Sequence, residues 1–272
     1  MDRSTKILKN IKKNGFGIEI GPSFNPVAPK RAGYKVEIID HASQEDLIVK
    51  YKSHNVDTNL IEKVDYIWNG EKYSKLTDKC KFYDWLIASH VIEHTPDLIG
   101  FIQNCGEILK EDGIISLVIP DKRFCFDRFR PVTGISKIID SHFQKNSIHS
   151  PGTVVEYFLN VVSKEKKIAW GQDTQGVYEL KHTLNDAIRG MNSVISNKKY
   201  IDVHNWCFTP HVFRLLINDL YDLGLIQFRE LEFFPTDGFE FYMTLSKKGA
   251  GINESRLDIL ELIEEEIRFV DY

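Results

Sequence analysis

The chain has 272 residues, of which 42% are hydrophobic and 27% are charged, as in an ordinary soluble globular protein. This length suits one large α/β domain, or one domain with a sizeable insertion. The net charge of −4 argues against a general affinity for nucleic acid, and no apolar run is long enough to cross a bilayer.

The N-terminal residues lack the apolar core of a secretory signal peptide, so we expect a cytoplasmic protein. The cysteines are scattered and form no C-x-x-C pair. We therefore expect buried thiols in a reducing compartment, with neither a disulfide framework nor a metal site. The four cysteines are Cys80, Cys105, Cys125 and Cys207.

Strand-like and helix-like runs alternate over the first 120 residues. A short helix is predicted over 4–13 and a longer one over 96–113, where Pro96 suits the first turn and Gly113 suits the exit. This alternation indicates a parallel sheet with right-handed crossovers. The predicted strands are 16–20, 35–40, 64–68, 83–90 and 114–120.

The pattern breaks after the fifth strand. Residues 121–203 are polar and contain no convincing buried strand, so we expect a mainly helical insertion or cap. The pattern resumes with a predicted helix over 209–225 and a hairpin whose turn sequence is TDG. We therefore expect a Rossmann-like α/β core, residues 1–120 and 204–272, with a mostly parallel sheet that ends in an antiparallel hairpin.

The C-terminal residues 254–270 predict a final helix with one apolar stripe. Such a stripe more often packs on its own domain, so a homodimer formed through it is the weaker alternative. The stripe consists of Leu257, Leu260, Ile263, Ile267 and Val270.

The segment GFGIEIGPSFNPV (15–27) predicts a buried strand followed by a ligand-binding loop. It lacks the G-x-G-x-x-G spacing of a dinucleotide fingerprint and the G-K-[ST] of a phosphate-binding loop, which argues against an NAD-dependent dehydrogenase. In open parallel sheets the ligand lies at the carboxyl ends of the strands. The strand ends here carry Glu19, Gly21, Asp40, Asn69, Gly70, Glu71, Ser89 and His90.

This ordered set resembles the class I S-adenosylmethionine-dependent methyltransferases. The shared pattern is an acid and a glycine after the first strand, an acid closing the second, ASHVIEH after the fourth, LKEDGIISLVIPD at the fifth and a closing hairpin. It covers residues 15–125 and 205–248. The resemblance implies S-adenosylmethionine as the cofactor and S-adenosylhomocysteine as its product.

The resemblance also implies roles for the loop after the first strand. Gly21 would let the backbone approach the methionine part of the cofactor, where a side chain would obstruct it. Glu19 would orient the loop or meet the cofactor's amino group. Pro22 and Ser23 stand where family members often carry further glycines, so the loop departs from the family pattern here.

Three further strand ends have implied roles. Asp40 would accept hydrogen bonds from both ribose hydroxyls, unless it only caps the following helix. The segment from Asn69 to Glu71 would border the adenine, unless it is only a turn. Ser89 and His90 would line the cofactor beside the fourth strand.

The acceptor of the methyl group is expected between the exit of the fifth strand and the insertion. There the segment 120–134 carries four cations, which suggest a small anionic or phosphorylated acceptor because guanidinium groups match phosphate. The alternative is a solvated helix face with internal Asp–Arg pairs. The four cations are Lys122, Arg123, Arg128 and Arg130.

A neutral hydroxyl acceptor also needs a base to take its proton. His204 is the first candidate, because the ordinary pKa of histidine lies near working pH, and Trp206 would face the same mouth. His94 and Asp121 are the other candidates. Each has a structural alternative, which for His94 is fixing the VIEHTP turn.

The segments IPDKRFCFDRFRP and VHNWCFTP resemble, more loosely, bacterial methyltransferases encoded beside glycosyltransferases in capsule and O-antigen pathways. This implies O-methylation of a sugar, a nucleotide-linked sugar or a phosphate-type group such as a capsular phosphoramidate. Two alternatives stay open: a methyltransferase acting on a protein or a lipid-like acceptor, and a catalytically inactive cofactor-binding module.

Overall fold

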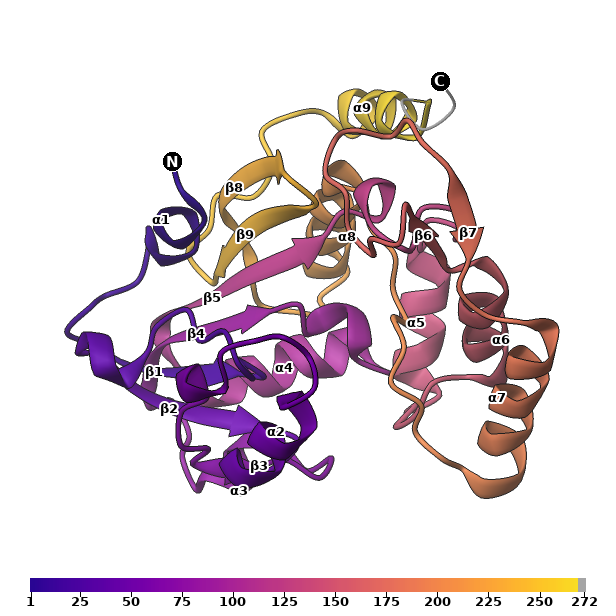
Figure 1. The fold of residues 1–272 in the computed structure, drawn as a ribbon. Coiled ribbons are helices and arrows are strands. Elements are labelled where there is room, and N and C mark those ends of the chain that lie inside the picture. The colour runs from indigo at the N-terminus through magenta and orange to yellow at the C-terminus, as the bar shows by residue number, and fades with distance from the viewer. Residues whose placement is uncertain (269–272) are drawn as a thin grey trace.

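One mixed sheet of seven strands organises the computed structural model, which describes residues 1–268 (Figure 1). Its order is β3-β2-β1-β4-β5-β9-β8, with parallel pairing from β3 to β5 and antiparallel pairing of β9 with β5 and β8. This confirms the predicted Rossmann-like fold with its closing hairpin. The strands are β1 Phe16–Ile20, β2 Lys35–Asp40, β3 Tyr66–Ile67, β4 Tyr83–Ser89, β5 Leu109–Pro120, β8 Arg229–Asp237 and β9 Glu240–Ser246.

The strand order reverses between β1 and β4, which places a crevice at the carboxyl ends of these two strands. No helix within residues 1–268 combines the length and the apolar character needed to span a membrane. The helices are α1 Arg3–Leu8, α2 Gln44–Tyr51, α3 Tyr73–Thr77, α4 Leu98–Ile108, α5 Ile135–Phe143, α6 Pro151–Asn160, α7 Leu184–Asn197, α8 Pro210–Asp222 and α9 Arg256–Arg268, with short 3-10 turns η1 Lys30–Ala32, η2 Thr58–Leu60, η3 Ile92–His94 and η4 Lys122–Phe124.

The two faces of the sheet are covered unequally. The larger core lies between the sheet and the helices α4, α5 and α8. On the opposite face, Ile7 of α1 and Val27 pack with Val36 of β2 and Trp85 of β4. Trp85 lies beside Gly17 of β1, and a Cβ atom on Gly17 would come within 2.2 Å of the indole ring. The central strand therefore needs glycine at this position to admit the tryptophan.

The helix predicted over 96–113 is shorter in the structure. It is capped by Asp97, whose carboxylate accepts a hydrogen bond from the Gly100 N–H at 2.9 Å, so Pro96 precedes the helix. The chain enters β5 at Leu109, and Gly113 lies in a bulge of that strand rather than at a helix exit. The apolar spacing reaches Leu109, which is buried as the first residue of β5, whereas Glu111 and Asp112 are exposed.

Two other elements are also shorter than predicted. The first helix covers only Arg3–Leu8, and the third strand only Tyr66–Ile67. The exposed Cys80 also differs from the expectation that all four thiols are buried.

The insertion between β5 and α8 is mainly helical, as predicted, and stands beyond the arrowheads of β4 and β5 (Figure 1). It also contains a small antiparallel pair, β6 Val162–Lys164 and β7 Tyr178–Leu180. All three residues of β6 are buried, so the prediction of no buried strand was wrong. Part of the cause is tertiary, since the Val162 N–H donates to the Phe126 carbonyl at 3.1 Å. The domain boundaries stay a prediction.

The final helix α9 turns a different face inward than the sequence suggested. Ile259 is fully buried and Ile263 packs on the core, but the Glu266 carboxylate is buried as well. It accepts a hydrogen bond from the His211 N–H at 3.1 Å, which fixes the orientation of the helix. In the predicted stripe, Leu257, Leu260 and Ile267 are exposed. Val270 lies outside the described residues.

Candidate functional site

Glu19 ties the loop after β1 to the end of that strand. Its carboxylate is almost fully buried and accepts hydrogen bonds from the N–H groups of Val27 at 2.7 Å and Ala28 at 3.2 Å. Burial raises the pKa of Glu19 to about 7, although these two N–H groups act in the opposite direction. Both oxygens are thus used to orient the loop, which is one of the two roles that the resemblance implies.

This buried acid should make stability depend on pH. Its folded pKa of about 7 lies above the unfolded value of 4.5, so its contribution is fully present below pH 4.5 and is lost as pH rises to 7. The loss amounts to about 3 kcal/mol. In Glu19→Gln the group cannot titrate, so denaturant unfolding between pH 5 and 8 should show the wild type losing stability relative to the variant. Parallel pH profiles for the two proteins would contradict this assignment.

The turn that follows β1 has left-handed backbone at two positions. Gly21 has φ +62°, and a Cβ atom there would lie 3.1 Å from Val91 Cγ2. Ser23 has φ +51°, its N–H donates to Asp40 Oδ2 at 3.2 Å, and its buried hydroxyl has no hydrogen-bond partner. Pro22 between them is buried. The turn therefore presents a compact backbone and an unpaired hydroxyl beside the end of β2.

Asp40 closes β2 and is buried. Its Oδ1 accepts a hydrogen bond from the His41 N–H at 2.7 Å. The alternative that Asp40 caps the next helix is wrong, because Ser43 is the N-cap residue of α2. Asp40 instead joins the ends of β1 and β2 through the Ser23 N–H.

The segment after β3 forms an exposed turn. Gly70 has φ +98°, Glu71 Oε2 accepts a hydrogen bond from the Asn69 N–H at 3.2 Å, and the Glu71 carbonyl accepts one from the Trp68 indole at 2.7 Å. The Trp68 N–H donates to the Asp40 carbonyl at 2.8 Å, which holds this turn beside the end of β2. The contacts are those of a turn, and the proposed border with adenine stays a prediction.

The end of β4 is joined to β9 and to the N-terminal helix. The Ser89 hydroxyl accepts a hydrogen bond from Arg3 Nη2 at 2.8 Å, and His90 Nε2 lies 2.7 Å from Glu240 Oε2. Burial alone would raise the pKa of Glu240, but His90 and Arg3 lower it to about 2. Sequence reasoning missed Arg3 and Glu240, since neither stands in a recognisable motif.

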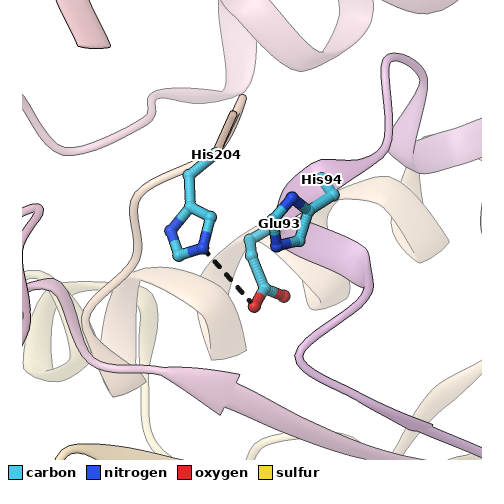
Figure 2. A group of neighbouring side chains, drawn as sticks. All are labelled: Glu93, His94 and His204. Atoms are coloured by element: carbon cyan, nitrogen blue, oxygen red, sulfur yellow. Dashed lines mark ion pairs between the residues drawn. The ribbon is translucent and has the colours of Figure 1, made fainter. Parts of the chain in front are cut away.

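Glu93, His94 and His204 come together although they lie on opposite sides of the insertion in sequence. Figure 2 shows His204, from the segment before α8, facing the Glu93 carboxylate, with His94 beside it. His204 Nε2 lies 3.9 Å from Glu93 Oε1, and one ligand atom from each of the three residues lies within 4.8 Å of the others. The sequence singled out both histidines as candidate bases but did not single out Glu93.

Each histidine of this group is held by a second carboxylate. His204 Nδ1 is paired with Asp127, and His94 Nδ1 lies 2.9 Å from Asp202 Oδ1. Burial alone would raise the pKa of Asp127, but His204 and Arg130 lower it to about 2. Burial alone would lower the pKa of His94, but Asp202 and the charge of Glu93 raise it overall.

The four cations after β5 form ion pairs and hydrogen bonds inside the protein. Arg123 pairs with Asp121 at 2.6 Å, Arg130 pairs with Asp127 at 2.8 Å, and Lys122 Nζ donates to the Arg128 carbonyl at 2.7 Å. All four cations are buried. The structure therefore favours internal Asp–Arg pairing, but in the protein interior rather than on a solvated helix face. For Arg123 and Arg130 this pairing argues against the anionic-acceptor interpretation, which stays a prediction for the cluster as a whole.

Arg128 belongs to the same buried group. Its Nη1 donates to the Arg123 carbonyl at 3.1 Å, and its guanidinium lies over the rings of Phe129 and Tyr178. Asp121, a candidate base, is fully buried and also accepts a hydrogen bond from Thr236 Oγ1 at 2.6 Å. Its contacts with Arg123 and Thr236 make it a structural anchor rather than a base open to an acceptor.

Trp206 is buried as well. Its indole N–H donates to Thr95 Oγ1 at 3.2 Å, and Lys137 Nζ lies 5.3 Å from the ring centroid. Both side chains line a cavity of about 290 Å³ bordered by α5 and α6, to which Asn205 also contributes. Since the Asn205 N–H donates to the Glu93 carbonyl at 2.7 Å, this cavity adjoins the group of Glu93, His94 and His204.

Comparison with models of known protein families gave no match, and comparison with curated proteins gave none either. Solved structures with a similar fold include a SAM-dependent methyltransferase from Aquifex aeolicus, at 10% identity and a TM-score of 0.43 over 89% of this chain and 88% of that one. A SAM-dependent methyltransferase from Methanosarcina mazei matches at 12% identity and a TM-score of 0.43 over 89% and 96%.

A protein from Rhodobacter sphaeroides matches as well, at 11% identity and a TM-score of 0.45 over 91% and 90%, and is named as a Zn-dependent alcohol dehydrogenase. For three further methyltransferase structures the match spans 54%, 50% and 53% of their chains. These likenesses are too distant to transfer an activity. The Rossmann-like fold of this chain rests on its own sheet order.

Proposed function

We propose that the chain is an S-adenosylmethionine-dependent methyltransferase. The observation that carries the proposal is the turn at Gly21 and Ser23, which lies where the strand order reverses and joins the buried Asp40. At Gly21 the turn lets a ligand come close to the backbone, and its sequence is not that of a glycine-rich phosphate-binding loop. Such a turn suits a nucleoside that carries an amino acid in place of a pyrophosphate, with Asp40 beside the ribose.

The acceptor is proposed to be a small polar molecule of the sugar type, methylated on oxygen during surface polysaccharide synthesis. The looser resemblance of the segments around Asp121 and His204 supports this class. Between a sugar hydroxyl and a phosphate oxygen, Arg123 and Arg130 favour the hydroxyl, because both guanidinium groups are buried and already paired with carboxylates.

The reaction forms a bond between the acceptor oxygen and the methyl carbon and breaks the bond from that carbon to sulfur. S-adenosylhomocysteine leaves, and the hydroxyl proton must pass to a base or to solvent. The group of Glu93, His94 and His204 is the candidate for handling that proton. Glu93 and His94 follow β4 in the chain, at the carboxyl edge where a reacting oxygen would be placed, and the segment before α8 brings His204 to them.

Calorimetry with S-adenosylmethionine and S-adenosylhomocysteine tests the cofactor. We expect Asp40→Asn to weaken binding about tenfold or more, since it removes a charged hydrogen-bond acceptor. Glu45→Gln, on an exposed position of α2, is the matched control and should bind as the wild type does. If neither ligand binds to the wild type, the proposal is wrong.

The acceptor is tested separately by incubation with sugars and nucleotide sugars, followed by mass spectrometry for a gain of one methyl group. Transfer to a protein or lipid-like acceptor instead would point to the alternative acceptor class. Cofactor binding without transfer to any acceptor would point to an inactive binding module.

A further inference from the structure

We propose that Glu93, His94 and His204 bind one divalent transition-metal ion, with Zn²⁺ as the first candidate. Two imidazoles and one carboxylate are a ligand set that suits zinc. No metal site was expected from the sequence, because its cysteines form no ligand pattern and Glu93, His94 and His204 come together only in the fold. This inference goes beyond the proposed function and does not depend on it.

The distances are close to those of a metal site. Ligand atoms bound to one Zn²⁺ at about 2.0–2.1 Å lie about 3.3 Å apart in a tetrahedron. His204 Nε2 and Glu93 Oε1 are already 3.9 Å apart, and all three ligand atoms lie within 4.8 Å of one another (Figure 2). The gap to be closed is therefore about 0.6 Å for this pair and at most about 1.5 Å for the others.

Both histidines are oriented by a carboxylate, as metal-binding histidines usually are. A ligating imidazole commonly uses its other nitrogen to bond a carboxylate, which fixes the ring orientation and strengthens the ligand. His204 uses Nδ1 for Asp127, and His94 uses Nδ1 for Asp202. In each ring this leaves Nε2 for an ion.

The buried Glu93 carboxylate supports a bound cation separately from the geometry of the histidines. Its side chain is fully buried, and neither carboxylate oxygen has a hydrogen-bond partner. A buried carboxylate without hydrogen bonds is unfavourable. His90 Nδ1 at 3.5 Å and His204 Nε2 at 3.9 Å make ion-pair contacts with Glu93 Oε1, but neither forms a hydrogen bond with it. A cation between Glu93 and the two histidines would satisfy this group.

Three protein ligands leave a fourth position open, as in catalytic zinc sites. If the proposed function holds, the open position suits the acceptor oxygen, because a bound cation lowers the pKa of a coordinated hydroxyl. His204 would then be a ligand and not a free general base, since one Nε2 lone pair cannot serve both purposes.

The test uses full-length protein without a histidine tag, freed of metal with EDTA, and titrated with ZnCl₂ or CoCl₂ in the absence of cofactor. We expect one ion per chain by calorimetry and visible absorption bands for the Co²⁺ form. Glu93→Gln should weaken binding about 100-fold or more. Asp202→Asn should weaken it about tenfold, and because Asp202 is exposed this variant should stay folded.

His142→Asn is the matched control. His142 also uses Nδ1 for a carboxylate, at 2.9 Å from Asp97, but it lies outside the proposed site. Its Kd for Zn²⁺ should stay within about twofold of the wild type. The proposal is overturned if the wild type shows no saturable binding, or if folded Glu93→Gln and Asp202→Asn bind as tightly as the wild type. Cofactor calorimetry on the metal-free protein separates this outcome from failure of the proposed function.

Discussion

Gly17→Ala is expected to destabilise the protein by about 3 kcal/mol, one of the largest effects of any single methyl group in this chain. The added Cβ atom would lie 2.2 Å from the ring atoms of Trp85, which is fully buried. The indole cannot easily move aside, because its N–H donates to the Lys12 carbonyl at 3.2 Å and it packs edge-on to Tyr34. Denaturant titration of both proteins measures the change.

Gly152→Ala is the matched control for this prediction. Gly152 lies in the first turn of α6, where a Cβ atom would meet only Ser150 Oγ at 3.8 Å. It should be neutral or slightly stabilising, since alanine favours helix more than glycine does. Trp85→Phe should partly restore stability to Gly17→Ala. Equal stability of the two alanine variants would show that the β1–β4 contact is not as close as described.

Arg130→Ala is expected to cost about 3–5 kcal/mol of unfolding free energy. The guanidinium is fully buried and bonds Asp127 at 2.8 Å and Glu156 at 3.0 Å. Its removal takes a permanent positive charge away from the buried Asp127 carboxylate, which keeps its contact with His204 Nδ1. Thermal or denaturant unfolding measures the loss.

Arg189→Ala is the control for this variant, because Arg189 pairs with Asp186 on the exposed surface of α7. Exposed pairs contribute little, so the change should stay within about 0.5 kcal/mol. If Arg130→Ala were instead as stable as the wild type and only raised the KM for an anionic acceptor, the sequence-based interpretation of the cations would be right after all.

The elements of the core could be predicted because their signals are local. The strands Phe16–Ile20 and Lys35–Asp40 are short apolar runs with clear ends, and both match the structure residue for residue. The end of α4 could not be predicted, because Leu109 continues the helical spacing of apolar residues although it is already the first residue of β5. The buried strand Val162–Lys164 is too short and polar to recognise, and its burial is a tertiary effect.

The candidate site was predictable only in part. Sequence pattern led to both histidines, His94 and His204, but Glu93 could be recognised only once the fold had brought the two segments together. The partners of Arg123 and Arg130 were equally hidden, since residue spacing does not show which way a side chain turns. Cations in a sequence suggest an anionic ligand equally well whether or not the protein itself supplies the anions.

The two ends of the insertion lie side by side. Asp121 forms a bridge with Phe208, the Lys122 N–H donates to the Phe208 carbonyl at 2.9 Å, and the Thr133 N–H donates to the Cys207 carbonyl at 2.9 Å. Because its two ends are held together, the insertion is a closed loop, and the entropic cost of closing such a loop grows only slowly with its length. If the proposed function holds, the insertion could be replaced by another of different length and sequence, which would change the acceptor without altering the turn at Gly21.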